Sequence, residues 1–313
     1  MAETLETTKG RLAANTRPRR RSAPVIGWWT GWMPLLVLPP AVLLVVPATW
    51  PRWALMWLLS VLIFAGCKWL TWRRAAKHEA PVWLHVGYLF GWPGLDAKGF
   101  LTRRTGLLKP TVAEWLFASI KSAIGLFILI GLVRLLPSDQ PYLIGWLGMI
   151  GVVMTLHFGL FHLLSCAWRV IGIDAKPLMN WPLCSVSLSE FWGRRWNTAF
   201  RDLAHSFLFR PLTPRLGARG AVIAGFLFSG VVHDVVISIP AGGGYGGPTL
   251  YFVIQGIGML VERSVVGRKL GLGQGWIGWL FAMALLAGPV PLLFHLPFVT
   301  RVVTPFLQAV GVV

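Results

Sequence analysis

Long apolar runs separated by basic connections are the dominant pattern of this sequence. About 20 apolar residues in helical conformation cross the hydrocarbon core of a bilayer. We expect membrane-spanning helices in seven runs, near 26–48, 53–72, 113–135, 142–166, 221–240, 248–266 and 276–298. Prolines interrupt the first run and leave this count open by one span. The pattern predicts an all-α, multi-pass membrane bundle.

The two long connections, 73–112 and 167–220, show a second pattern. Both mix aromatic residues and leucine with basic residues at amphipathic spacing, as in "PVWLHVGYLFGWPGLDAKGF" and "LSEFWGRRWNTAFRDLAHSFLFRPL". In the latter, one helix face is expected to gather Phe191, Trp192, Trp196, Phe200, Leu203 and Phe207. Amphipathic helices of this kind lie in the membrane interface or dip into the bundle. We therefore expect interfacial helices around a cavity that opens on their side.

Charge position then orients the chain. The net charge is +18, and the chain is 55% hydrophobic but only 13% charged, against about 25% charged in soluble domains. Basic residues gather in 1–25, 73–112, 167–220 and 263–269, whereas the other connections hold few. This is the positive-inside distribution, so the N-terminus is expected in the cytoplasm and the C-terminus outside. The positive charge is thus explained without a nucleic-acid partner.

Two regions follow from this organisation. Residues 1–24 are basic and have no apolar period, and are expected to form a disordered cytoplasmic tail against anionic headgroups. Residues 25–313 are expected to form a single membrane-embedded domain, because no internal repeat of fixed period divides them. No small-residue cleavage site follows the first apolar run, so that span is expected to be retained.

The segment "FLFSGVVHDVVISIP", residues 226–240, places His233 and Asp234 inside an apolar run. Ionisable groups within a span are costly and commonly mark a site or a pathway. Ser229 lies four residues before His233 and can orient its ring. Asp234 points about 100° away on a helix and is not a partner of His233 through their own helix. The alternative is a structural histidine that bonds between helices.

Other polar positions are weaker candidates. His157 and His162 are five residues apart, about 140° around a helix, and cannot share a metal through one face; packing between helices is their alternative. In "EFWGRRWN", Arg194 and Arg195 match phosphate oxygens, and Asn197 can hold a carbonyl or an oxyanion. Interfacial anchoring is the alternative for that segment.

Metal and nucleotide signatures are missing. Cys67, Cys166 and Cys184 have no ligand spacing and are expected to be reduced structural thiols. The glycine-rich "AGGGYGGP" lacks the Lys-Ser/Thr of a phosphate-binding loop. The GxSxG, HExxH and HxxxxD patterns are absent as well. We expect no metal centre.

Three segments together resemble the wax synthase-like branch of the membrane-bound O-acyltransferases: "EFWGRRWNTAFRD", "FLFSGVVHDVVISIP" and "GGYGGPTLYFVIQGIGMLVER". The segments "LFGWPGLDAKGFL" and "HFGLFHLLS…WRVIGIDAKPLMN" look like bacterial members of that branch. The resemblance covers residues 83–265; the remainder matches only in hydropathy. One departure is Asp234, since many relatives have Glu after the histidine.

The resemblance implies a bundle around a tunnel in which acyl-CoA, entering from the cytoplasm, meets a hydrophobic alcohol. It implies long-chain-alcohol O-fatty-acyltransferase activity, with His233 as catalytic base and Asn197 as its partner. It also implies a bacterial inner-membrane location, membrane lipids as surroundings, acyl-CoA as co-substrate and no cofactor. The residues expected to bind substrate around that tunnel are Trp192, Arg194, Arg195, Trp196, Arg201, Ser229, His157 and His162.

Two other functions stay open. A transporter could relay protons through His233 and Asp234, but several charged residues in different spans and inverted halves would then be expected. Lys68, Lys121 and the His233–Asp234 pair are nearly all the charges within the spans. The other possibility is a lipid-binding scaffold without enzymatic activity.

Overall fold

The computed structural model describes residues 28–75, 79–103 and 106–313. Within these ranges the chain is helical and has no strand, which confirms the predicted all-α class. The predicted tail, residues 1–24, lies outside the described residues, as do positions 25–27 of the predicted domain.

Nine of the described α-helices have ten or more residues: α1 (Trp28–Val45), α2 (Arg52–Ala75), α3 (Val82–Gly91), α5 (Val112–Leu126), α6 (Pro141–Val153), α7 (Phe161–Val170), α10 (Arg210–His233), α12 (Gly247–Glu262) and α14 (Gly275–Ala287). The shorter α-helices are α4 (Ala97–Leu101), α8 (Leu188–Glu190), α9 (Thr198–Ala204), α11 (Ile239–Ala241), α13 (Val265–Lys269), α15 (Val290–Leu293), α16 (Leu296–Phe298) and α17 (Thr304–Ala309). Single π turns form η1 (Phe127–Leu132), η3 (Met154–Leu160), η5 (Phe191–Arg195), η6 (His205–Phe209), η7 (Asp234–Ser238) and η8 (Val299–Val303). The 3₁₀ turns are η2 (Val133–Leu135) and η4 (Pro182–Cys184).

Five helical stretches are long and apolar enough to cross a membrane, which supports an integral membrane protein. They are Arg52–Ala75, Val112–Leu135, Pro141–Val170, Thr198–Ala241, which is kinked at Gly217, and Gly275–Leu293. The π turns matter here because they continue one α-helix into the next, as η3 does between α6 and α7. At the two other predicted spans, α1 is a shorter apolar helix and α12 has 16 residues. The predicted count of seven is therefore not confirmed.

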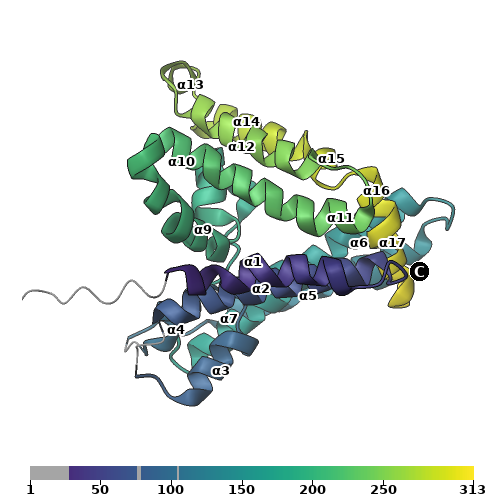
Figure 1. Ribbon diagram of the computed structural model, residues 1–313, viewed down its shortest axis with the longest axis horizontal. Coiled ribbons are helices and arrows are strands. Elements are labelled where there is room, and N and C mark those ends of the chain that lie inside the picture. Colours follow the sequence, from purple (N-terminus) through teal and green to yellow (C-terminus); the bar gives the residue numbers. More distant parts are fainter. Residues whose placement is uncertain (1–27, 76–78, 104–105) are drawn as a thin grey trace, which may run out of the picture.

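The long helices run along the long axis of the molecule (Figure 1). The elements of the basic connections, α3, α4, α9 and α13, lie at one end of that axis. The segments α11, α16 and α17 lie at the other end, together with the C-terminus. The basic connections thus share one end, as the charge pattern predicted.

The 73–112 connection packs onto the bundle through α2. Lys68 of α2 is 2% exposed, and its Nζ donates to the carbonyl oxygens of Tyr88 at 2.7 Å and Gly94 at 2.6 Å. The same ammonium lies 3.7 Å from the centroid of the Tyr88 ring. Because Leu84 and Tyr88 are fully buried, α3 is anchored in the bundle rather than lying loosely on its surface.

The segment 188–212, whose apolar spacing predicted one amphipathic helix face, does not form a single helix. It divides into α8–η5 and α9–η6, with a break at Trp196 and Asn197, where Asn197 adopts the left-handed conformation at φ 42°. Phe191 and Phe207 are buried as expected, but Phe200 is 39% exposed. The prediction of one face is wrong for Phe200, which lies in the first turn after the break, whereas Leu203 and Phe207 further along are buried.

The helices α10 and α12 pack closely beside His233. A Cβ atom on Gly230 would lie 2.6 Å from the Cα atom of Thr249, so this contact requires glycine. A side chain there would push α12 away from the end of α10. The glycine thus fixes the spacing of the two helices next to the ionisable pair.

Candidate functional site

A cavity of about 1420 Å³ lies within the bundle. Its lining comes from α5, α6, η3, α7, η5, α9, α12, α14 and α15, from the segments 92–96 and 174–184, and from His233 at the end of α10. The volume exceeds the roughly 300–1,000 Å³ of typical small-molecule sites, so the cavity has room for long substrates. The expected cavity is present and is lined in part by the 167–220 connection, while its opening to the cytoplasm stays a prediction.

The His233 ring is held in a defined orientation at the cavity wall. Its Nδ1 atom lies 2.7 Å from the main-chain carbonyl oxygen of Ser229, and its ring centroid lies 4.4 Å from that of Phe252. A carbonyl oxygen can only accept, so Nδ1 carries the proton and Nε2 keeps its lone pair in the neutral ring. Ser229 therefore orients the ring as predicted from its position, although it does so through its main chain.

Asp234 has a separate structural role. Its Oδ1 accepts hydrogen bonds from the Ser238 hydroxyl at 2.7 Å and from the Gly246 N–H at 2.9 Å. Its Oδ2 accepts from the Thr249 N–H at 3.0 Å and from the Thr249 hydroxyl. The carboxylate thus caps the N-terminus of α12, where negative charge is favoured by the helix dipole.

Asn197 lies at the helix break and caps α9. Its Oδ1 accepts from the Phe200 N–H at 3.5 Å, and its own N–H donates to the sulfur of Met179 at 3.3 Å. Asparagine tolerates the left-handed conformation better than most residues, which suits it to this position. Its neighbours Trp196 and Thr198 line the cavity. The role of Asn197 as a partner of His233 stays a prediction.

The other candidates of this segment divide into two groups. Trp192, Trp196, Arg194 and Arg201 line the cavity. Trp192 packs edge-on against Phe226, and Arg201 donates to the Gly193 carbonyl oxygen at 2.9 Å. By contrast, Arg195 forms an ion pair with Glu190 at 2.7 Å and donates to the Trp181 carbonyl oxygen.

The two histidines of the 142–170 stretch have different surroundings. His157 lies in η3, and its Nδ1 is buried with no hydrogen-bond partner among the described residues. His162 lies in α7 and lines the cavity. Its Nδ1 is 2.7 Å from Lys121 Nζ, and its Nε2 is 3.0 Å from Glu114 Oε1.

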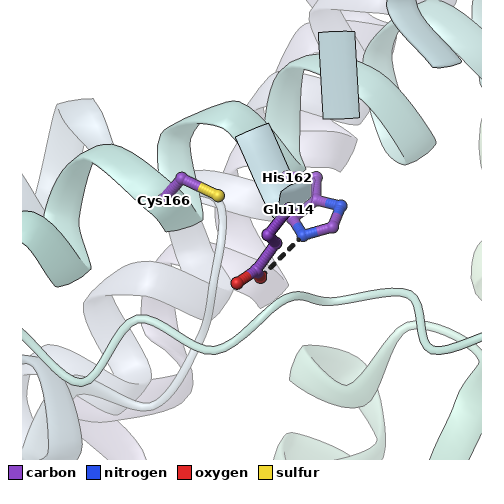
Figure 2. A group of neighbouring side chains, drawn as sticks. All are labelled: Glu114, His162 and Cys166. Carbon is purple, nitrogen blue, oxygen red and sulfur yellow. Dashed lines mark hydrogen bonds and ion pairs between the residues drawn. The ribbon is translucent and has the colours of Figure 1, made fainter. Parts of the chain in front are cut away.

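This polar cluster was not predicted from the sequence. Glu114 also pairs with Arg169, which binds both carboxylate oxygens. Figure 2 shows Glu114 beside the His162 ring, with Cys166 on the next turn of α7. The spacing of these residues along the sequence could have indicated the cluster. Glu114 and Lys121 are seven residues apart, as are His162 and Arg169. Seven residues make about two helical turns, which places each pair on one face.

The cluster also offers oxygen, nitrogen and sulfur atoms within 4.8 Å of one another, on Glu114, His162 and Cys166. A metal ion would need their lone pairs. In the structure Lys121 and Arg169 direct N–H groups at these atoms. Two cations therefore occupy the positions that a metal would need, and the cluster fits an ion-pair network instead.

The chain is similar in sequence to a family of membrane-bound acyltransferases. The family described as "Membrane bound O-acyl transferase family" matches residues 175–254, which include Asn197, His233 and Asp234. The "Long-chain-alcohol O-fatty-acyltransferase" of Simmondsia chinensis is 27% identical over 185 residues, covering 50% of this chain and 51% of that protein. The "Probable long-chain-alcohol O-fatty-acyltransferase 3" of Arabidopsis thaliana is 26% identical over 168 residues, covering 48% and 46%.

These alignments span about half the length of the curated relatives. No solved structure matches the chain. The predicted resemblance is nonetheless confirmed by the family match, which lies within the predicted range 83–265, and by the names of these relatives. Over residues 175–254 this chain has the sequence pattern of the membrane-bound O-acyltransferases, and it is similar to their long-chain-alcohol O-fatty-acyltransferases.

Proposed function

We propose that this protein transfers a fatty acyl group from acyl-CoA to the hydroxyl group of a hydrophobic alcohol, with His233 as the general base. The observation on which this rests is the orientation of the His233 ring. Its Nδ1 is bound to the Ser229 carbonyl oxygen, and the residue lines a cavity large enough for both substrates. The family match covers the segment around His233, and the chain is similar to relatives named for this activity.

The chemistry needs one proton acceptor. Nε2 of His233 takes the proton from the alcohol hydroxyl while the alcohol oxygen attacks the thioester carbonyl carbon and forms the new C–O bond. The resulting oxyanion collapses, the C–S bond breaks, and the proton on Nε2 passes to the leaving CoA thiolate. The products are an ester and free CoA, and the ring returns to its starting state.

A hydrogen-bond donor near the carbonyl oxygen would stabilise the oxyanion, and we assign this role to Asn197. Its Oδ1 accepts from the Phe200 N–H, which leaves its Nδ2 amino group to donate. Such a donor is typically worth about 3–4 kcal/mol in the transition state.

The basic residues at the cavity rim match the phosphate-bearing end of acyl-CoA. Arg194, Arg201 and Lys176 belong to the cavity lining, and Arg194 and Lys176 are exposed. Guanidinium groups match phosphate oxygens in geometry and charge. In the proposed arrangement the CoA phosphates lie at this rim, while the acyl chain lies among the apolar residues of α6 and α14.

We further propose that the end holding the basic connections faces the cytoplasm of a bacterial inner membrane. The clustering of α3, α4, α9 and α13 at one end supports this orientation through the positive-inside rule. Acyl-CoA would then enter from the cytoplasmic side.

The transporter alternative is not favoured by the geometry of Asp234. A proton relay needs a carboxylate that can exchange protons with its neighbours, whereas this one accepts four hydrogen bonds from Ser238, Gly246 and Thr249. Donors on a carboxylate stabilise its ionised form. The group is better suited to holding structure than to moving protons.

Acyl-CoA consumption and ester formation by the purified protein, with a panel of long-chain alcohols, test the proposal. We expect ester formation with wild type and none with His233→Ala at unchanged melting temperature. His205→Ala is the matched control, because His205 is exposed and outside the cavity lining. Full activity in a folded His233→Ala variant would refute the mechanism.

A further inference from the structure

The network around His162 has a charge imbalance that faces the cavity. Glu114, Lys121 and His162 all belong to the cavity lining, although the proposed reaction uses none of them. The network also contains Arg169, whose guanidinium binds both oxygens of the Glu114 carboxylate. One negative and two positive side chains therefore meet at this wall, together with one imidazole.

The hydrogen-bond geometry fixes the state of that imidazole. The Lys121 ammonium can only donate, so His162 Nδ1, 2.7 Å away, accepts from it. The Nε2–H then donates to Glu114 Oε1 at 3.0 Å. A protonated imidazole would instead direct an N–H at the ammonium. The ring is therefore neutral, and the network has a net charge of +1.

The excess charge lies on Lys121, whose ammonium has unused bonding capacity. Among the described residues its Nζ contacts His162 Nδ1 and the face of the Phe117 ring, 4.4 Å from the centroid. An ammonium has three N–H donors, and these contacts engage two of them. A positive charge in a largely apolar cavity is costly unless an anion compensates for it.

The surroundings define the kind of anion. Phe117, Met149, Val153 and Phe158 line the same cavity, so a ligand there meets hydrocarbon beside a single excess positive charge. Lys121 is only partly exposed, whereas the rim lysine Lys176 is 77% exposed. A monoanionic headgroup on a long apolar chain matches both properties.

We propose that Lys121 marks a binding site for the carboxylate of a free long-chain fatty acid, with the alkyl chain in the apolar part of the cavity. Such a ligand would occupy the space of an acyl chain and so exclude the acyl donor. The proposal concerns binding to the cavity and does not require that the chain transfer acyl groups.

Binding of radiolabelled oleate to the purified protein in detergent, without acyl-CoA, tests the site. We expect unlabelled oleate to displace the label and methyl oleate, which has no charge, to fail. Lys121→Met should weaken oleate binding about tenfold or more, since a charge-assisted hydrogen bond is lost. Lys121→Arg should retain binding.

Glu114→Gln separates a charge effect from structural damage. It removes the negative charge of the network, so oleate should bind more tightly, whereas loss of packing would weaken binding. Lys269→Met is the control for a lysine elsewhere in the protein: Lys269 is exposed and outside the cavity lining, so this change should not affect oleate binding.

Four results would overturn the site. The first three are equal displacement by methyl oleate, unchanged binding in Lys121→Met, and weaker binding in both Lys121→Met and Glu114→Gln. Displacement by CoA without an acyl chain, dependent on Lys121, would assign the charge to a phosphate and would likewise reject the fatty-acid site. If Lys121→Met does not fold, the opposite expectations for Glu114→Gln and for neutral methyl oleate still decide the question.

Discussion

Asp234 accepts two hydrogen bonds from Thr249, one from its N–H at 3.0 Å and one from its hydroxyl, and so joins the end of α10 to the start of α12. His233, one residue earlier, bonds back to Ser229 and faces the cavity. Two adjacent ionisable residues therefore have separate contacts. The histidine ring lies at the cavity as the proposed base, and the aspartate joins the two helices beside it.

Replacing Asp234 with asparagine should lower stability more than it changes the chemistry. The amide would direct an NH₂ group at donors, and a lost bond to a charged group costs roughly 1.5–3 kcal/mol. We expect Asp234→Asn to melt at a lower temperature in detergent. At temperatures below its melting point, the variant should still form ester. Thr249→Val, which removes only the hydroxyl bond, should have a smaller effect. An unchanged melting temperature in Asp234→Asn would contradict this role.

Asn197→Asp tests the oxyanion assignment without disturbing the backbone. Aspartate also caps helices and also tolerates the left-handed conformation, but its side chain has no N–H group to donate. We expect the turnover number to fall by about 10²–10³ with little change in melting temperature. Asn197→Gly, which keeps the backbone conformation, should lose a similar factor. Activity near wild type in both variants would leave Asn197 as a helix cap only.

Lys68→Met should detach the 82–101 connection from α2. The Tyr88 and Gly94 carbonyl oxygens would lose their donor in a buried environment, at a cost of about 1–3 kcal/mol each before any relaxation. Thermal unfolding should show a clear drop. Lys98→Met is the matched control, because Lys98 is exposed in the same connection. Equal melting temperatures for the two variants would count against the anchoring role.

Glu190 should make the stability of the fold depend on pH in the acidic range. Burial alone would raise its pKa, but hydrogen bonds from the Val186 N–H and the Arg195 guanidinium outweigh this and lower the pKa. A carboxyl group with a lowered folded-state pKa stabilises the fold above its unfolded value, near 4.3, and loses this contribution as pH falls through the folded value. Melting temperatures between pH 6 and pH 3 should decline less steeply in Glu190→Gln. If the melting temperatures of wild type and Glu190→Gln fell equally with pH, the Glu190 carboxylate would not contribute to this pH dependence.

The sequence predicted the class, the cavity and the position of the basic connections, because hydropathy and charge along a chain are constrained by the bilayer itself. His233 stood out for the same reason, as an ionisable residue in an apolar run. These properties are local, so they can be recognised without tertiary structure.

Other features depend on contacts between distant segments. Asp234 meets Thr249 across 15 positions, and His162 meets Glu114 across 48. A periodicity argument identifies the faces of single helices but does not say which faces meet. The break at Asn197 was not predicted for a related reason. The apolar spacing from Phe191 to Phe207 favoured one helix face, whereas the left-handed residue divides the segment.

The π turn η7 has a consequence for how this region tolerates change. The Ile239 N–H bonds to the Asp234 carbonyl oxygen, five residues back, so the turn contains one residue more than an α turn. Deleting any single residue of 234–238 would let an α-helix close and would rotate everything beyond it by about 100°. Ser238 would leave His295, and Ala241 would leave Arg52. Replacing one apolar residue of this stretch by another should be tolerated, whereas inserting or deleting a residue should not.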